Sequence, residues 1–129
     1  MARPSNEHPT DRELTILKVL WEQGPSRLSA ICEGLGGQRG TAPSTVATML
    51  KIMSEKGLVE RVSSNTGMVW EARLTREKAG SGMLQSLMNR LFEGSAQKVV
   101  LQLLEGGKLS EKDQDQIRRM LKTKRKTKR

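Results

Sequence analysis

Apolar side chains recur at helical spacing over the first 35 residues and predict two helices there. The first is expected over about 10–22, because the capping-box sequence Thr10-Asp11-Arg12-Glu13 precedes the apolar positions and Gly24-Pro25 ends them. A second helix follows, and we expect the hydroxyl of Ser26 to cap its first turn. Its apolar positions repeat at i, i+3, i+4 and i+7, and Cys32 is one of them.

A third helix is predicted over about 43–56, in the stretch that begins PSTVATMLKIM. Pro43 suits a first turn, where the N–H that proline lacks has no partner anyway, and Gly57 is a stop signal. One side of this helix is apolar and is expected to face a core. The opposite side is short-chained, hydroxylated and non-acidic, which is unusual for a face in contact with water. Its residues are Ser44, Ala47, Thr48 and Lys51.

The apolar pattern changes from helical to alternating after Gly57. Residues 58–63 are rich in Val, the sequence Ser64-Asn65-Thr66-Gly67 has turn chemistry, and residues 68–74 alternate at period two. A β-hairpin is therefore predicted directly after three helices. Helix–helix–helix–hairpin is the order of a winged helix-turn-helix domain, in which the third helix is presented to DNA and the hairpin is the wing.

Helical spacing returns after Thr75 and predicts three further helices. Gly80 and Gly82 weaken the start of the first, Ser95 is expected to cap the second, and Ser110 the third. The fold class is thus mainly α with a small β-hairpin wing. We expect a winged helix-turn-helix domain over 1–75, a helical dimerisation domain over 76–121 and a disordered basic tail over 122–129.

The second predicted domain has only about 45 residues, and a unit of that size rarely buries enough apolar surface to be stable alone. Its middle helix is apolar on almost every side, which makes the shortage worse. We therefore expect it to pair with a second copy, the alternative being a monomer in which these helices pack on the first domain. The candidate dimerisation residues are Met83, Leu84, Leu87, Met88, Leu91, Phe92, Val99, Val100, Leu103, Leu104, Ile117, Met120 and Leu121.

The net charge of +9 comes mostly from the end of the chain. Residues 118–129 hold eight of the 23 Lys and Arg side chains and no acid, so the other 117 residues carry 15 basic and 14 acidic side chains. Such a block can bind nucleic acid or an acidic membrane surface, or it can be a solvated arm that keeps the protein soluble. The charge alone therefore does not establish a nucleic-acid binder.

Catalytic and metal-binding chemistry is not supported by the residues present. His8 is the only histidine, and Cys32, the only cysteine, falls on an apolar helix face where a small buried side chain is expected. Neither has the partners that a catalytic pair or a zinc site needs. We expect no enzyme, cofactor or metal. No apolar run approaches the roughly 20 residues of a membrane helix, and we expect a cytoplasmic protein that does not bind a membrane.

The third helix and the hairpin carry side chains suited to DNA. Short residues let a helix backbone approach base edges, Ser and Thr hydroxyls can donate or accept, and a Thr methyl can touch a thymine methyl. In the alternative interpretation, Ser44 only caps the third helix, and Thr45 and Thr48 are exposed residues without a function. Arg and polar residues before the helix and on the hairpin are candidates for backbone contacts. The candidate DNA-binding residues are Arg39, Ser44, Thr45, Thr48, Lys51, Arg61, Ser63, Asn65 and Arg73.

Three stretches together resemble the penicillinase-repressor family of regulators (BlaI/MecI/CopY type): ELTILKVLWEQGPSRLSAI, STVATMLKIMSEKGLVER and LFEGSAQKVVLQLLEGGKLSEKDQDQIRRML. The resemblance covers about Thr10 to Leu121. Its most specific parts are Trp-Glu-x-Gly-Pro, Thr-Val-x-Thr and Phe-x-Gly-Ser. It implies a homodimeric repressor with an N-terminal winged helix, a C-terminal helical dimerisation domain and a palindromic operator. Thr45, Val46 and Thr48 fall on the family's Thr-Val-x-Thr.

The chain departs from this family pattern at several positions. Ile52 stands where members often carry Arg, and the wing strand differs at Val69 and Trp70, so the operator preference is expected to differ. Gln102-Leu103 stands where β-lactam-responsive members are cleaved at an Asn-Phe pair, which puts that switch in doubt. The basic end lacks the cysteine-rich hook of copper-responsive members. The sequence names no inducer, upstream sensor or protease.

Together these features predict a homodimeric repressor that reads a palindromic operator in double-stranded DNA with its third helix in the major groove. The main alternative is a non-specific nucleic-acid or RNA-associated protein that binds through its basic tail. A winged-helix module for protein–protein contact is a third class, and the non-acidic outer face of the third helix argues against it.

Overall fold

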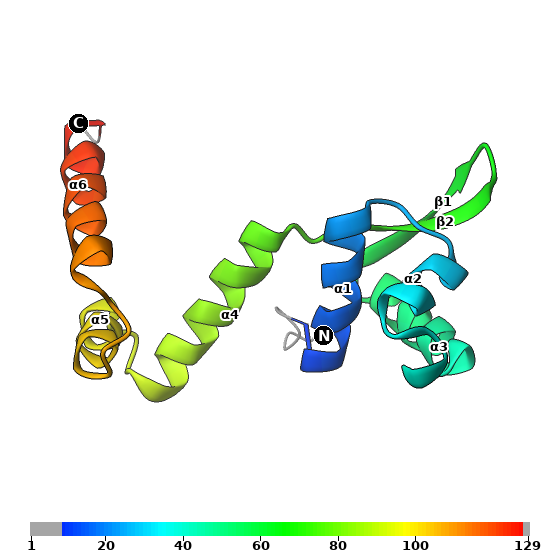
Figure 1. Ribbon diagram of the computed structural model, residues 1–129, viewed down its shortest axis with the longest axis horizontal. Coiled ribbons are helices and arrows are strands. Elements are labelled where there is room, and N and C mark those ends of the chain that lie inside the picture. The colour runs from blue at the N-terminus through cyan, green and yellow to red at the C-terminus, as the bar shows by residue number, and fades with distance from the viewer. Residues whose placement is uncertain (1–8, 128–129) are drawn as a thin grey trace. The chain divides into compact units, whose positions relative to one another are not determined.

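The computed structural model describes residues 9–127 and consists mainly of helices with one β-hairpin (Figure 1). The chain divides into two compact units, one running to Leu84 and the other starting at Gln85, so the division falls inside a helix. The elements are α1 (Asp11–Gln23), α2 (Leu28–Gly34), the 3-10 helix η1 (Gly37–Arg39), α3 (Pro43–Glu55), β1 (Val59–Ser64), β2 (Gly67–Ala72), α4 (Arg76–Leu91), α5 (Ala96–Glu105) and α6 (Glu111–Thr127).

The first unit has one hydrophobic core, to which α1, α2, α3 and the hairpin all contribute. The apolar stripes that predict the three helices are the faces that they bury, because each helix must remove one side from water. The thiol of Cys32 lies in this core, as expected for a small buried side chain. The buried residues of the core are Ile16, Leu17, Leu20, Ile31, Cys32, Val46, Leu50, Met53, Leu58 and Val59.

Local signals at the helix ends are mostly those that the sequence predicts. The Thr10 hydroxyl accepts from the Glu13 N–H and the Glu13 carboxylate accepts from the Thr10 N–H, which is a complete capping box. Pro43 is the first residue of α3, and Gly57 follows this helix with a φ of 83°. Ser95 caps α5 by accepting from the Lys98 N–H at 3.1 Å.

The predicted role of Ser26 as the cap of α2 is wrong. The residue that precedes α2 is Arg27, and its side chain makes no capping hydrogen bond. Ser26 is buried, and its backbone exchanges two hydrogen bonds with Trp70 on β2, at 2.9 and 2.8 Å. Pairing with the hairpin uses the backbone of Ser26, and its hydroxyl donates to the Gly24 carbonyl instead, at 2.8 Å.

The hairpin pairs β1 and β2 in antiparallel register from Val59↔Ala72 to Ser64↔Gly67, so its two-residue turn is Asn65-Thr66. Trp70, Ala72 and Leu74 pack against the core, as the period-two pattern suggests. The pattern is wrong at the start of β2, where Met68 of the same set is exposed and Val69 is buried. The Trp21 indole N–H donates to the Leu74 carbonyl at 2.9 Å, which ties α1 to the segment that follows the hairpin. Three helices followed by this hairpin form the winged helix-turn-helix arrangement (Figure 1).

The second unit consists of the end of α4 with α5 and α6. Gly80 and Gly82 lie within α4, which is continuous through both. Ser110 and Asp113 form a reciprocal cap at the start of α6, with hydrogen bonds of 3.0 and 3.2 Å. Residues 122–127 continue α6, where the sequence predicts a disordered tail. Residues 128–129 lie outside the described part of the chain.

Among the described helices, none is both long and apolar enough to cross a membrane.

Candidate nucleic-acid interface

The outward face of α3 carries the side chains for which we predict DNA contact. Val46, Leu50 and Met53 have no exposed surface, which fixes the rotation of α3 on the core. Because the buried and exposed faces of a helix are opposite, this anchoring presents the other side of α3 to water. The predicted residues on that exposed side are Ser44, Thr45, Thr48 and Lys51.

The hydroxyl of Thr48 is more restricted than the sequence suggests. Thr48 Oγ1 donates to the Ser44 carbonyl within α3, at 3.0 Å. A hydroxyl has one hydrogen, so this bond leaves only lone pairs and the γ-methyl for another molecule. Thr48 therefore offers an acceptor and an apolar contact to another molecule. Its hydroxyl is not available as a donor, because its hydrogen is bound within the helix.

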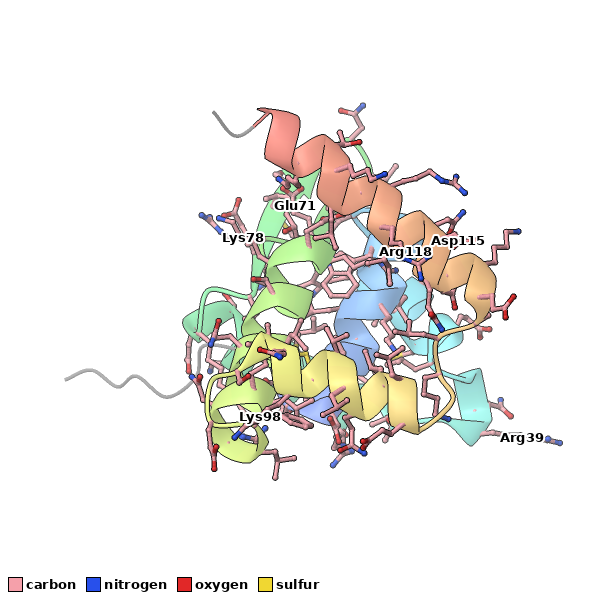
Figure 2. The ribbon with its side chains drawn as sticks, turned by 90° about the vertical axis from the view of Figure 1, so that its left-hand side faces the viewer. Arg39, Glu71, Lys78, Lys98, Asp115 and Arg118 are labelled. Carbon is pink, nitrogen blue, oxygen red and sulfur yellow. The ribbon has the colours of Figure 1, made fainter. Side chains whose placement is uncertain are left out.

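The start of α3 is suited to a phosphate. The residue before the helix is Ala42, which has no side-chain acceptor, and the first turn contains no acidic side chain. The N–H groups of a first helical turn have no intrahelical partners and attract anions when no side chain caps them. Arg39 ends η1 just before this turn, is exposed, and extends away from the ribbon (Figure 2).

The hairpin is held against the helices by contacts from the segment between α1 and α2. The Ser26 bridge to Trp70 joins the middle of β2 to this segment. The Arg27 guanidinium donates to the Thr66 carbonyl at the hairpin turn. Sequence reasoning missed Arg27, because nothing near it in the chain signals a contact with so distant a turn. The two contacts fix the middle and the tip of the wing.

The outward side chains of the hairpin differ in the charge that they leave available. Arg61 stacks over the ring of its cross-strand neighbour Trp70, with 5.8 Å from Cζ to the ring centroid. Arg73 forms an ion pair with Glu60, so part of its charge is compensated. Ser63 and Asn65 are exposed near the turn. Arg61 is thus better placed than Arg73 to meet a phosphate.

A groove of about 640 Å³ lies between α3 and the hairpin. It brings Lys51 of α3 together with Arg61 of β1, two of the residues for which we predict DNA contact. Glu55 also lines it, so its charge is mixed rather than uniformly positive. Ser44, Thr45 and Asn65 do not line this groove. The groove residues are Leu28, Ala47, Lys51, Ser54, Glu55, Arg61, Met68 and Trp70.

Lys56 follows α3 but is bound to α1. Its Nζ lies 2.7 Å from Glu13 Oε2, and only 8% of the Glu13 side chain is exposed. Burial acts to raise the pKa of Glu13, but hydrogen bonds from Lys56 and Thr10 and the charge of Lys56 outweigh it, so the pKa lies below the ordinary value of 4.5. This pair joins α1 to the end of α3 and takes one carboxylate away from the outer surface.

The predicted dimerisation residues are accessible in the single chain. No residue of α5 is buried, and Leu91, Met120 and Leu121 are each more than half exposed. Met83, Met88, Phe92 and Val99 are half-buried. Leu101, which we did not include in the predicted set, is exposed as well. The exposed predicted residues are Leu84, Leu87, Leu91, Val100, Leu103, Leu104, Ile117, Met120 and Leu121.

Comparison with known proteins identifies one family over most of the chain. The penicillinase repressor family model matches residues 9–123. The chain is 23% identical over 112 residues to the penicillinase repressor of Bacillus licheniformis, covering 87% of this chain and 88% of that protein. It is 20% identical over 112 residues to the methicillin resistance regulatory protein MecI of Mammaliicoccus sciuri, covering 87% and 91%.

Solved structures of other regulators show a weaker likeness. A point mutant of Lactococcus lactis ZitR matches with a TM-score of 0.47 and 18% identity, covering 100% of this chain and 82% of that one. A MarR family protein from Bacillus stearothermophilus matches with a TM-score of 0.47 and 19% identity, covering 72% and 66%.

Proposed function

The chain belongs to the penicillinase repressor family and is on that ground a winged-helix, DNA-binding transcriptional regulator of the repressor type; from this premise we propose that it works as a homodimer on a palindromic operator. In this proposal α3 of each copy enters the major groove, and two half-sites lie about one helical turn or more apart. Residues 1–75 bind DNA and residues 76–121 hold the dimer together.

The observation that carries the DNA-binding role is the outward face of α3. Three fully buried side chains on the opposite side of α3 fix this face toward water. The face carries hydroxyl groups and Lys51, and the first acidic residue of the helix is Glu55, its last residue. A carboxylate at the start or middle of this face would repel the phosphates that line a groove. The hairpin and its Arg61 lie beside this face across the shared groove.

The observation that supports a homodimer is the amount of apolar surface that the second unit leaves in water. Burying such surface contributes about 25 cal/mol per Å². Among the described residues of the second unit, nine large apolar side chains are exposed, so covering them is substantially favourable. A second copy offers the same surface and closes the contact with two-fold symmetry. That symmetry is also what a palindromic operator requires.

Binding to duplexes selected by the protein from a random pool tests the proposal. We expect enrichment of a palindrome, one dimer bound per duplex, and an affinity that falls with a log–log salt slope of about −0.9 for each phosphate contacted. A randomised duplex of equal length should bind far more weakly at every salt concentration. Equal affinity for both duplexes across salt would contradict sequence-specific binding.

The alternative of a tail-driven, non-specific binder predicts another outcome. Because α6 continues through Thr127, we would neutralise Lys122, Lys124 and Lys126 by substitution to Gln, which keeps helix propensity, rather than delete the segment. A repressor should keep its preference for the selected palindrome and lose only general affinity. Loss of nearly all binding, with folding unchanged, would favour the tail.

A further inference from the structure

Two large apolar side chains are exposed on the elements of the candidate interface, Ile52 on α3 (44%) and Met68 on β2 (46%). Single exposed apolar residues are common on protein surfaces, so exposure alone decides nothing. Ile52, however, makes no evident contribution to the stability of a single folded chain. It adds nothing to the buried core, and a β-branched residue is a poorer helix former than Ala, Lys or Glu.

The position of Ile52 on α3 indicates what its exposed side chain can contact. It lies four residues after Thr48 and seven after Thr45, so the three side chains form one stripe on the outward face. The hydroxyl hydrogen of Thr48 is used within the helix, which leaves a methyl group and acceptor lone pairs toward any partner. The C-terminal part of this stripe, formed by Thr48 and Ile52, is therefore apolar. These two residues lie about 6 Å apart along the helix axis.

Only one group in the major groove of DNA matches an apolar stripe, the 5-methyl group of thymine. We propose that Ile52 is a specificity-determining residue that contacts a thymine methyl in each half-site, within about two base pairs of the base beside Thr48. The spacing follows from the rise of the helix and the roughly 3.4 Å between base pairs. This inference rests on the proposed function, because it needs α3 to lie in the major groove.

Replacing thymine by uracil tests the contact, because it removes only the methyl group and leaves base pairing unchanged. The probe is a duplex selected from a random pool by the full-length protein, with thymines replaced one symmetric pair at a time. At one pair, we expect wild-type affinity to fall about fourfold per half-site, or roughly 15-fold for both, since a buried methyl contributes about 0.8 kcal/mol.

The variant Ile52→Ala should bind the thymine duplex more weakly and lose the discrimination between thymine and uracil at that pair. Met68→Ala is the matched control, since it truncates the other exposed apolar side chain of the interface and should keep the discrimination. Thermal unfolding should be nearly unchanged in both variants, because both side chains are about half exposed.

Three results would overturn the inference. They are a wild-type protein that distinguishes thymine from uracil at no pair, an Ile52→Ala variant that keeps the full discrimination, and a Met68→Ala variant that alone loses it. Failure of the proposed function gives a different result, because a random pool would then yield no enriched sequence. The two failures are therefore separable in one series of measurements.

Discussion

Glu13 shows how one side chain can hold two elements together. Its carboxylate accepts from the Thr10 N–H at the start of α1 and lies 2.7 Å from Lys56 Nζ after α3. Charged hydrogen bonds are stronger than neutral ones, and a partly buried carboxylate is costly without them. We therefore expect Glu13→Gln to lower the free energy of unfolding at neutral pH by about 1–2 kcal/mol. Urea titration measures the change, with Asp11→Asn as the control, because Asp11 is an exposed acid of the same helical turn.

The lowered pKa of Glu13 also sets the pH range of this effect. The ionised carboxylate favours the folded state, so its contribution is fully present above the ordinary pKa of 4.5 and is lost as pH falls through the lower folded-state pKa. The difference between wild type and Glu13→Gln should therefore shrink as the pH falls below 4.5. A difference that is constant from neutral to acidic pH would show that charge is not the source.

Thr48 marks what the sequence could and could not predict at this scale. Helical spacing correctly places it on the exposed side of α3, because the buried stripe of Val46, Leu50 and Met53 fixes the opposite side. The hydrogen bond from its hydroxyl to Ser44 depends on the side-chain rotamer, which spacing does not determine. Whether Thr48 and its neighbours contact bases stays a prediction.

At the scale of secondary-structure elements, the same substitution at two glycines should change the free energy of unfolding in opposite directions. Gly57 follows α3 with a φ of 83°, a region that side chains with a Cβ rarely adopt, whereas Gly80 lies inside α4. A Cβ would meet nothing within 4 Å at either position, so backbone conformation alone decides. We expect Gly57→Ala to destabilise by about 1–2 kcal/mol and Gly80→Ala to stabilise by about 0.5–1 kcal/mol. Thermal unfolding of both variants measures this, and effects of equal sign would contradict it.

The wing offers a test of how its tip is positioned. Arg27→Gln removes the guanidinium that donates to the Thr66 carbonyl but leaves the Ser26–Trp70 bridge intact. We expect faster amide exchange at the Asn65-Thr66 turn, an unchanged core, and several-fold weaker binding of the selected duplex. Arg39→Gln is the control for amide exchange at the turn only, because it removes the same charge from η1, away from the hairpin. Its own binding of the duplex should also weaken, since Arg39 is a candidate phosphate contact. Exchange at the turn that is unchanged in Arg27→Gln would show that the tip is held otherwise.

Elements with strong local signals were predicted well, and those that depend on distant contacts were not. The capping box at Thr10 and the proline that begins α3 involve residues within one helical turn, so the chain itself encodes them. Ser26 has the chemistry of a cap, but its backbone pairs with Trp70, far along the chain. Tertiary pairing overrides local preference here, and α2 begins at Leu28, one residue later than a cap at Ser26 implies.

At the scale of the molecule, the two units are stabilised differently. The first has a core of buried residues drawn from three helices and the hairpin. The described part of the second has no buried residue in α5, and its large apolar side chains remain exposed. Sequence composition predicts this contrast, because short apolar helices without a matching sheet or helix layer cannot cover one another. The partner that covers these side chains lies outside the chain, so no local sequence signal identifies it.

A charge placed on α5 tests that partner. Val100 is 47% exposed in the single chain, so Val100→Glu should leave each chain folded, yet in the proposed dimer it would bury an unpaired carboxylate. That burial costs about 3 kcal/mol or more, which corresponds to at least roughly 100-fold weaker dimerisation. Sedimentation equilibrium should show a monomer, and binding of the selected palindrome should fall with it. Gln102→Glu adds the same charge on the opposite side of α5 and should remain dimeric. A Val100→Glu dimer as tight as wild type would remove α5 from the interface.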